Sequence, residues 1–218
     1  EANMIGVSAG LSMCGKIPFA ITIAIFAVER CFEQIRQDAC YQKQNVKIVG
    51  FGGGTTYGAL AATHHAIEDI AIMRAIPGMT VIAPADPRET AKAVEAVFNC
   101  PGPAYLRIGR AGEPAVYEKD YEFKIGRAVT LREGNDLTLI SCGLILPQVL
   151  AAQKELEKQN IKARVINMHT IKPIDRDIVI KAAEETGRII TIEDHNIIGG
   201  LGSAVAEILA EEGFGIPF

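Results

Sequence analysis

Apolar and polar residues follow one another in blocks that predict helices and strands in turn along the chain. Short apolar runs bounded by glycine or proline are typical of strands buried in a parallel sheet, and apolar residues three or four positions apart predict helices. In the first half, Met4, Val7 and Leu11 are expected to share one face of the first helix. The pattern there predicts helices 3–15, 27–40, 65–76 and 87–98, and strands 17–26, 45–50, 79–84 and 103–108.

A second set of elements follows a stretch with no clear period. Residues 109–124 carry two glycines, a proline and mixed charges, which is typical of a linker. Strands that alternate with helices need crossover connections and form mainly parallel sheets. We therefore predict an α/β fold with two domains, 1–115 and 122–218. The second is expected to hold strands 126–133, 136–143, 162–167 and 187–194, and helices 146–159, 174–185 and 201–211.

Composition narrows the class of protein. The 218 residues are 49% hydrophobic and 22% charged with a net charge of −4, and Lys and Arg do not cluster, so neither nucleic acid nor a membrane surface is an expected partner. Five scattered cysteines without CxxC spacing predict free thiols in a reducing compartment, and hence a cytoplasmic protein. The chain starts inside a helical pattern and stops without a closing element, so we expect a piece of a longer polypeptide.

The stretch "FGGGTTYGALAATHHAIEDI", residues 51–70, is the first candidate site. A phosphate-binding P-loop would need GxxxxGK followed by Ser or Thr, but Gly58 is followed by alanine. Adjacent histidines, His64 and His65, would point about 100° apart on a helix and could not easily share a metal ion. Two interpretations stay open: a ligand-binding loop at the carboxyl edge of a parallel sheet, or a tight turn whose histidines cap a helix.

Other candidates carry weaker signals. "NIIGGLGSAV", residues 196–205, departs from the dinucleotide fingerprint and favours helix packing and capping. His169 and His195 stand beside strand ends, where we expect structural roles. Arg107 and Arg110 follow a strand and are either surface charges or a clamp for an anion.

Several motifs together resemble transketolases. "EANMIGVSAGLSMCGKIPF" resembles the family's AEQNM…AAGLA…GKIPF stretch, and "TIAIFAVERCFEQIR" resembles TFAVFATGRAFEIIR. "IEDIAIMRAIPGMTVIAPAD", "PAYLRIGR", "VINMHTIKPID" and "TIEDHNIIGGLGSAVAEIL" match as well, so the resemblance runs in order through the whole chain. It is closest to bacterial and archaeal enzymes split into two polypeptides. It implies an N-terminally incomplete pyrimidine-binding domain, then a C-terminally incomplete transketolase C-terminal domain.

The resemblance implies transfer of a two-carbon ketol unit between sugar phosphates with thiamine diphosphate, as in pentose phosphate metabolism. Glu1 matches the catalytic glutamate, which is expected to share a proton with N1′ of the aminopyrimidine and so favour removal of the thiazolium C2 proton. Phe26 matches the ring that stacks on the pyrimidine, and Ile23 falls at another aromatic position of that pocket.

The substrate side of the implied site is altered. His64 matches a catalytic histidine near the first hydroxyls of the sugar, with His65 beside it, and Arg110 matches the arginine that binds the sugar phosphate. The family's loop reads THAGIxxGEDGxTHQ, and here its histidine, glutamate, aspartate and glutamine are replaced by Gly52, Ala59, Leu60 and His65. Lost hydrogen-bonding partners predict a rim reshaped for a different sugar.

The chain lacks the family's GDG…N motif for the diphosphate and Mg²⁺. We therefore expect no metal site of its own, and a partner, the N-terminal transketolase subunit, in a homodimer or heterotetramer. Two alternatives stay open: another thiamine enzyme, similar to 1-deoxyxylulose-5-phosphate synthase or a 2-oxo-acid dehydrogenase beta subunit, and a catalytically silent regulatory subunit. The motifs fit transketolase better, and retention of Glu1 and Phe26 argues against a silent role.

Overall fold

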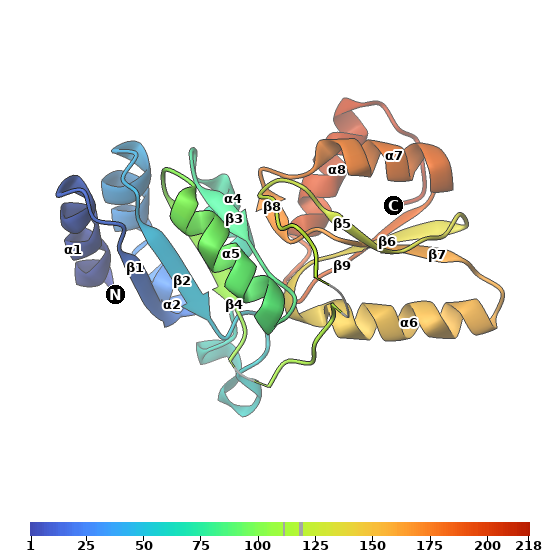
Figure 1. The fold of residues 1–218 in the computed structure, drawn as a ribbon, viewed down its shortest axis with the longest axis horizontal. Coiled ribbons are helices and arrows are strands. Elements are labelled where there is room, and N and C mark those ends of the chain that lie inside the picture. The colour runs from blue at the N-terminus through green and yellow to red at the C-terminus, as the bar shows by residue number, and fades with distance from the viewer. Residues whose placement is uncertain (111, 118–119) are drawn as a thin grey trace.

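Two mainly parallel sheets organise the chain into two α/β lobes that lie side by side (Figure 1). The computed structural model describes residues 1–110, 112–117 and 120–218. The first sheet has the strand order β1 (Phe19–Ile23), β2 (Lys47–Phe51), β4 (Ala104–Ile108), β3 (Thr80–Ile82) and β8 (Thr170–Lys172). The second has the order β5 (Val129–Arg132), β7 (Ala163–Asn167), β6 (Leu137–Ser141) and β9 (Ile189–Ile192). The prediction of a two-domain α/β fold is confirmed, and the boundary near residue 115 stays a prediction.

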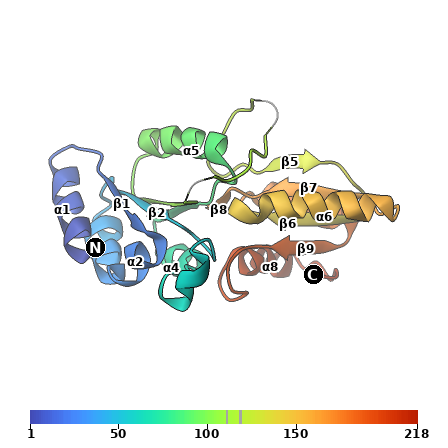
Figure 2. The same ribbon diagram turned by 90° about the horizontal axis from the view of Figure 1, so that it is seen from below.

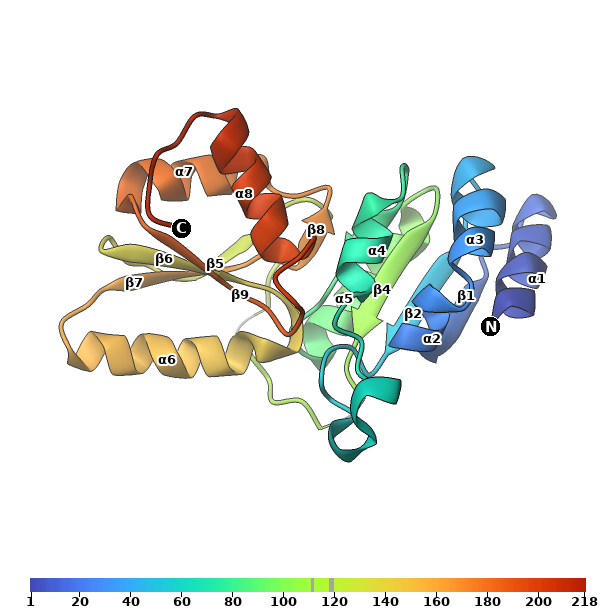
Figure 3. The same ribbon diagram turned by 180° about the vertical axis from the view of Figure 1, so that it is seen from behind.

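Helices cover both faces of each sheet, as crossover connections require. In the first lobe, α5 (Pro87–Asn99) lies on one face, and α2 (Ala24–Glu29) and α4 (Asp69–Ala75) lie on the other (Figure 2). In the second lobe, α6 (Leu146–Lys158) lies on one face, opposite α7 (Arg176–Thr186) and α8 (Leu201–Glu211) (Figure 1). The outer end of the first lobe holds α1 (Ala2–Met13), α3 (Phe32–Gln34) and the π-helix η1 (Ile35–Tyr41), as Figure 3 shows. None of the helices among the described residues is both long enough and apolar enough to cross a membrane.

The register of the first sheet brings two loops to one edge. Strands β2 and β4 run parallel, with Phe51 opposite Ile108 at their carboxyl ends. The backbone of Gly53 then donates to the carbonyl of Ile108 at 3.1 Å. The glycine-rich loop after β2 and the Gly109–Arg110 segment after β4 therefore leave the sheet together.

Two local predictions were wrong. The apolar run 17–26 is not one strand, because β1 ends at Ile23 and α2 begins at Ala24. A short apolar run has the same pattern in a strand and in a buried helix. In α1, Val7 and Leu11 are exposed, whereas Ile5, Ser8, Ala9 and Ser12 are buried, because the small residues form the packed face.

The two lobes share structure across their boundary. Strand β8 comes from the second half of the chain but pairs antiparallel with β3 in the first sheet. The main hydrophobic core also spans both lobes, with Ile70 and Met73 of α4 in the same cluster as Leu201 and Ile208 of α8. The lobes are thus packed into one unit.

The described part of the predicted linker, 109–110, 112–117 and 120–124, contains no helix or strand but is held by a buried carboxylate; residues 111, 118 and 119 lie outside the described residues. Glu89 of α5 accepts hydrogen bonds from the hydroxyls of Tyr117, at 2.8 Å, and Tyr121, and from the amide of Asn167 in β7. Burial raises the pKa of Glu89.

Candidate functional site

Each of the three consecutive glycines faces a different side chain. A Cβ built on Gly52 would lie 2.2 Å from Cε2 of Tyr57, one on Gly53 would lie 2.7 Å from Cγ of Arg107, and one on Gly54 would lie 1.8 Å from Oδ2 of Asp194. Gly52 and Gly54 also have φ of +72° and +65°, where glycine is favoured. Close packing against side chains therefore explains the glycines.

A buried ion pair anchors this loop. Arg107 Nε lies 2.9 Å from Oδ2 of Asp69, which also accepts from the hydroxyl of Tyr105 at 2.6 Å, and all three residues are buried. Burial, together with the adjacent Asp69 carboxylate, raises the pKa of Tyr105 well above its ordinary value. The surface-charge interpretation of Arg107 is therefore wrong.

Arg107 also ties the loop to the second lobe. Its Nη2 donates to the carbonyl of Ala66, at 2.8 Å, and to the carbonyl of Asp194, at 2.7 Å. The Asp194 carboxylate accepts from the backbone N–H of Thr55 at 3.0 Å and from its hydroxyl at 3.1 Å. Both the start and the end of the loop are fixed by these contacts.

Three of the sequence-predicted residues lie in one row along the rim. The ring centroids of Phe26, on α2, and His64, at the end of the 3₁₀-helix η2 (Gly58–Thr63), are 5.3 Å apart in an edge-to-face arrangement. His64 is also 5.3 Å from the ring of Tyr57, and Cζ of Arg110 lies 4.4 Å above that same ring. Ile23 is half-buried and packs with Phe26 against the small cluster that contains Ala66. Tyr57 was not predicted, because its importance depends on the space above Gly52.

Glu1 reaches this row through a residue that sequence reasoning missed. Its carboxylate lies 3.3 Å from Nη1 of Arg30, and Cζ of Arg30 lies 4.1 Å from the centroid of the Phe26 ring. A guanidinium on an aromatic face is a favourable cation–π contact. The order of contacts is therefore Glu1, Arg30, Phe26, His64, Tyr57 and Arg110.

The remaining candidates lie apart from the row. His65 donates from Nε2 to the carbonyl of Gly58 at 3.1 Å, and Leu60 is half exposed. His169 is buried and stacks on Phe123, and burial lowers its pKa to about 4. His195 accepts from the backbone of Ala71 at 3.3 Å.

The predicted capping role of the second glycine cluster is confirmed. The carboxylate of Glu193 accepts from the backbone N–H groups of Leu201, at 2.7 Å, and Gly202, at 2.8 Å, which open α8. A carboxylate at a helix N-terminus satisfies N–H groups that have no partner within the helix and interacts favourably with the helix dipole.

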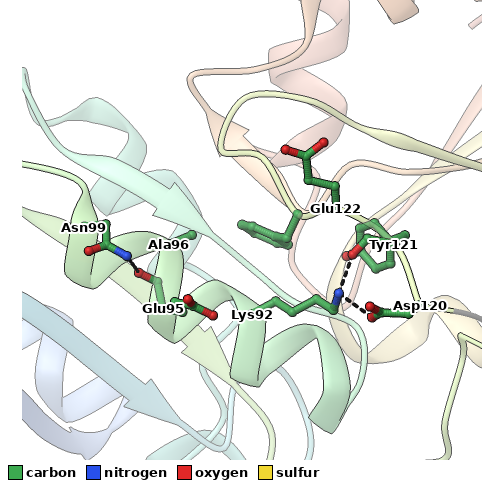
Figure 4. Close-up of a pocket in the computed structure, with 8 residues that line it drawn as sticks. Lys92, Glu95, Ala96, Asn99, Asp120, Tyr121 and Glu122 are labelled. Atoms are coloured by element: carbon green, nitrogen blue, oxygen red, sulfur yellow. Dashed lines mark hydrogen bonds and ion pairs between the residues drawn. The ribbon is translucent and has the colours of Figure 1, made fainter.

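A separate cavity of about 660 Å³ lies between α5 and residues 120–123. Figure 4 shows Lys92 reaching across it to the Asp120 carboxylate and the Tyr121 carbonyl. None of the predicted site residues lines this cavity. Among the described residues, no group of three or more His, Cys, Asp or Glu side chains is placed to hold a metal ion.

Comparison with known families identifies both halves of the chain. Residues 1–112 match the family model "Transketolase, pyrimidine binding domain", and residues 126–217 match "Transketolase, C-terminal domain".

Individual relatives come from split transketolases. The chain is 48% identical over 97% of its length, and 68% of the relative's, to one subunit of the apulose-4-phosphate transketolase of Phocaeicola vulgatus. It is 43% identical over 97% of its length, and 66% of the relative's, to the SqwH subunit of the 6-deoxy-6-sulfo-D-fructose transketolase of a Clostridium species. A solved structure described as "Split gene transketolase, inactive beta4 tetramer" is 47% identical with a TM-score of 0.92, and the match covers 100% of this chain and 69% of that one. The chain thus spans about two thirds of the length of these relatives, and it belongs to the transketolase family, as a chain of the split-enzyme type that the motifs predict.

Proposed function

We propose that this chain is the C-terminal subunit of a split transketolase and transfers a two-carbon ketol unit between sugars. Transketolases generally use thiamine diphosphate and a divalent metal. The observation that supports the proposal is the continuous row from Glu1 to Arg110 at the carboxyl edge of the first sheet. The diphosphate and Mg²⁺ are assigned to an N-terminal partner subunit, in a cytoplasmic homodimer or heterotetramer.

The cofactor side of the row suits a flat, nitrogen-bearing ring. Glu1 and Phe26 together contact the guanidinium of Arg30, a planar group with N–H donors, the first by an ion pair and the second by ring contact. An aminopyrimidine needs the same two kinds of contact. Glu1 would hold a proton shared between its carboxylate oxygen and N1′, Phe26 would orient the ring, and Ile23 would pack beside Phe26. When bound, thiamine diphosphate supplies the carbon nucleophile for ketol transfer.

The substrate side places a histidine and an arginine on either side of one ring. The Thr63 hydroxyl lies 2.9 Å from Nδ1 of His64, which fixes the imidazole and leaves Nε2 to contact a sugar hydroxyl. Arg110 is exposed, and its guanidinium suits a terminal phosphate or sulfonate. His65 stays a predicted second contact, held by the loop backbone.

The substrate is proposed to differ from the usual pentose phosphates. Gly52 and Leu60 cannot hydrogen-bond a sugar through their side chains, and a site that loses such partners rejects the old substrate by several kcal/mol, about 10⁴-fold or more in the strongest cases. The related subunits named above belong to transketolases of other sugars. Xylulose 5-phosphate should therefore be a poor donor.

The experiment is hydrogen–deuterium exchange at C2 of thiamine diphosphate, followed by NMR, in the complex of this subunit with its N-terminal partner. Glu1→Gln should abolish enzyme-catalysed exchange, whereas Glu33→Gln, at an exposed position on α3, should leave it unchanged. Unchanged exchange in Glu1→Gln would remove Glu1 from its role. Efficient turnover of xylulose 5-phosphate would overturn the proposed change of substrate.

A further inference from the structure

Tyr57 occupies the space that a side chain at position 52 would need. Its ring is only 8% exposed although it belongs to a loop. A Cβ on Gly52 would lie 2.2 Å from Cε2, 2.9 Å from Cδ2 and 3.0 Å from Cζ of this ring. A glycine at 52 and an aromatic ring at 57 therefore form a matched pair, because neither a histidine nor an alanine at 52 fits beneath the ring.

Tyr57 also separates the two residues proposed to contact the substrate. On one side its ring lies 5.3 Å from His64 with the planes tilted by 51°. On the other side the guanidinium carbon of Arg110 lies 4.4 Å from the ring centroid. A rigid aromatic group in this place fixes the distance between the histidine and the arginine.

We propose that Tyr57 is the specificity-determining residue of this site, an inference that rests on the proposed function. The ring presents an apolar wall where the family's loop carries a hydrogen-bonding side chain at 52. Such a wall favours ketoses that carry an anionic group for Arg110 and turn carbon rather than a hydroxyl towards position 52. A hydroxyl pressed against the wall loses its hydrogen bonds with water.

The functional test compares donor sugars in the complex with the N-terminal subunit and thiamine diphosphate. The donors are xylulose 5-phosphate, fructose 6-phosphate, apulose 4-phosphate and 6-deoxy-6-sulfofructose, each assayed for kcat/KM. Tyr57→Ala should change the ratio between the best and the poorest donor by about tenfold or more, the scale of one packing contact. Tyr41→Ala, which removes a tyrosine that is 82% exposed, should leave the ratio unchanged.

Two failures are distinguishable in this assay. If the wild-type complex transfers no ketol unit from any of the four donors, the proposed function falls, and the role of Tyr57 falls with it. If the wild type is active and Tyr57→Ala keeps the same donor ratio, the proposed function stands and the role of Tyr57 is refuted.

A second measurement needs no partner or substrate. Gly52→Ala is made in the wild-type and in the Tyr57→Ala background, and the melting temperature of all four chains is compared. The backbone strain at φ +72° is common to both backgrounds, so only the contact with the ring differs. We expect Gly52→Ala to lower the melting temperature by several degrees more when Tyr57 is present. Equal losses would overturn the packing on which the inference depends.

Discussion

Replacing Arg107 by methionine should destabilise the protein more than any loss of a surface ion pair. The variant keeps much of the side-chain volume but removes the guanidinium from between Asp69 and the carbonyls of Ala66 and Asp194. Asp69 would stay buried with only the Tyr105 hydroxyl on its Oδ2, because its Oδ1 has no partner among the described residues. Leaving one buried charge unpaired costs about 3–5 kcal/mol.

For a chain of this length, about 2–4 °C of melting temperature is lost per kcal/mol, so Arg107→Met should melt roughly 6–20 °C below wild type. The assay is thermal unfolding followed by circular dichroism. The matched control is Arg127→Met, whose arginine is 62% exposed and pairs with Asp177 at 2.9 Å. An exposed pair contributes about 0–1 kcal/mol, so the control should lose less than about 4 °C.

A double variant separates charge from packing. In Asp69→Asn with Arg107→Met, no unpaired charge is left behind, so part of the lost melting temperature should return. If Arg107→Met melts within about 2 °C of wild type, or if the double variant is no more stable than Arg107→Met, the buried pair does not hold the rim as described.

Two further predictions follow from a buried imidazole and a strained loop residue. Burial lowers the pKa of His169 from 6.5 to about 4, so between these pH values the unfolded chain binds a proton that the folded chain excludes. The wild type should therefore lose up to about 3 kcal/mol through this residue as the pH falls from 6.5 to 4, and His169→Gln should lack that part of the loss. Urea unfolding at pH 7 and pH 4.5 measures it, and identical pH dependence in the two proteins would contradict it. Ala61 has φ 51° and ψ −146°, a conformation that costs about 1–3 kcal/mol for a residue with a Cβ. Ala61→Gly should raise the melting temperature and Ala62→Gly should not; a lower value for Ala61→Gly would show that the loop has another conformation in solution.

The order of elements could be predicted from the sequence where local signals were strong. Strand β4 is a buried apolar run that follows proline, and helix α5 begins with Pro87 after Asp86, whose carboxylate accepts from the backbone of Glu89. Strand β8 has only three residues, too few to carry a pattern, and it pairs with a strand about 90 residues earlier in the chain. Its position depends on how the two lobes pack.

The site shows the same division. Glu1, Phe26, His64 and Arg110 could be placed by motif, but the residues that connect them could not. Arg30 is an exposed arginine whose contact with both Glu1 and Phe26 depends on how α1 and α2 pack. Tyr57 shows no signal of its own, because its ring is buried only where position 52 is glycine.

The second lobe contributes to the rim through backbone and carboxylate contacts. Asp194, just after β9, receives Arg107 on its carbonyl and Thr55 on its carboxylate, and Gly54 has no Cβ because that carboxylate fills the space. A shift of the second lobe would therefore move the loop that carries Tyr57 and His64. The C-terminal domain supplies none of the residues in the row, yet it sets the position of the loop from which two of them come. This connection explains why the two domains share a core and a strand.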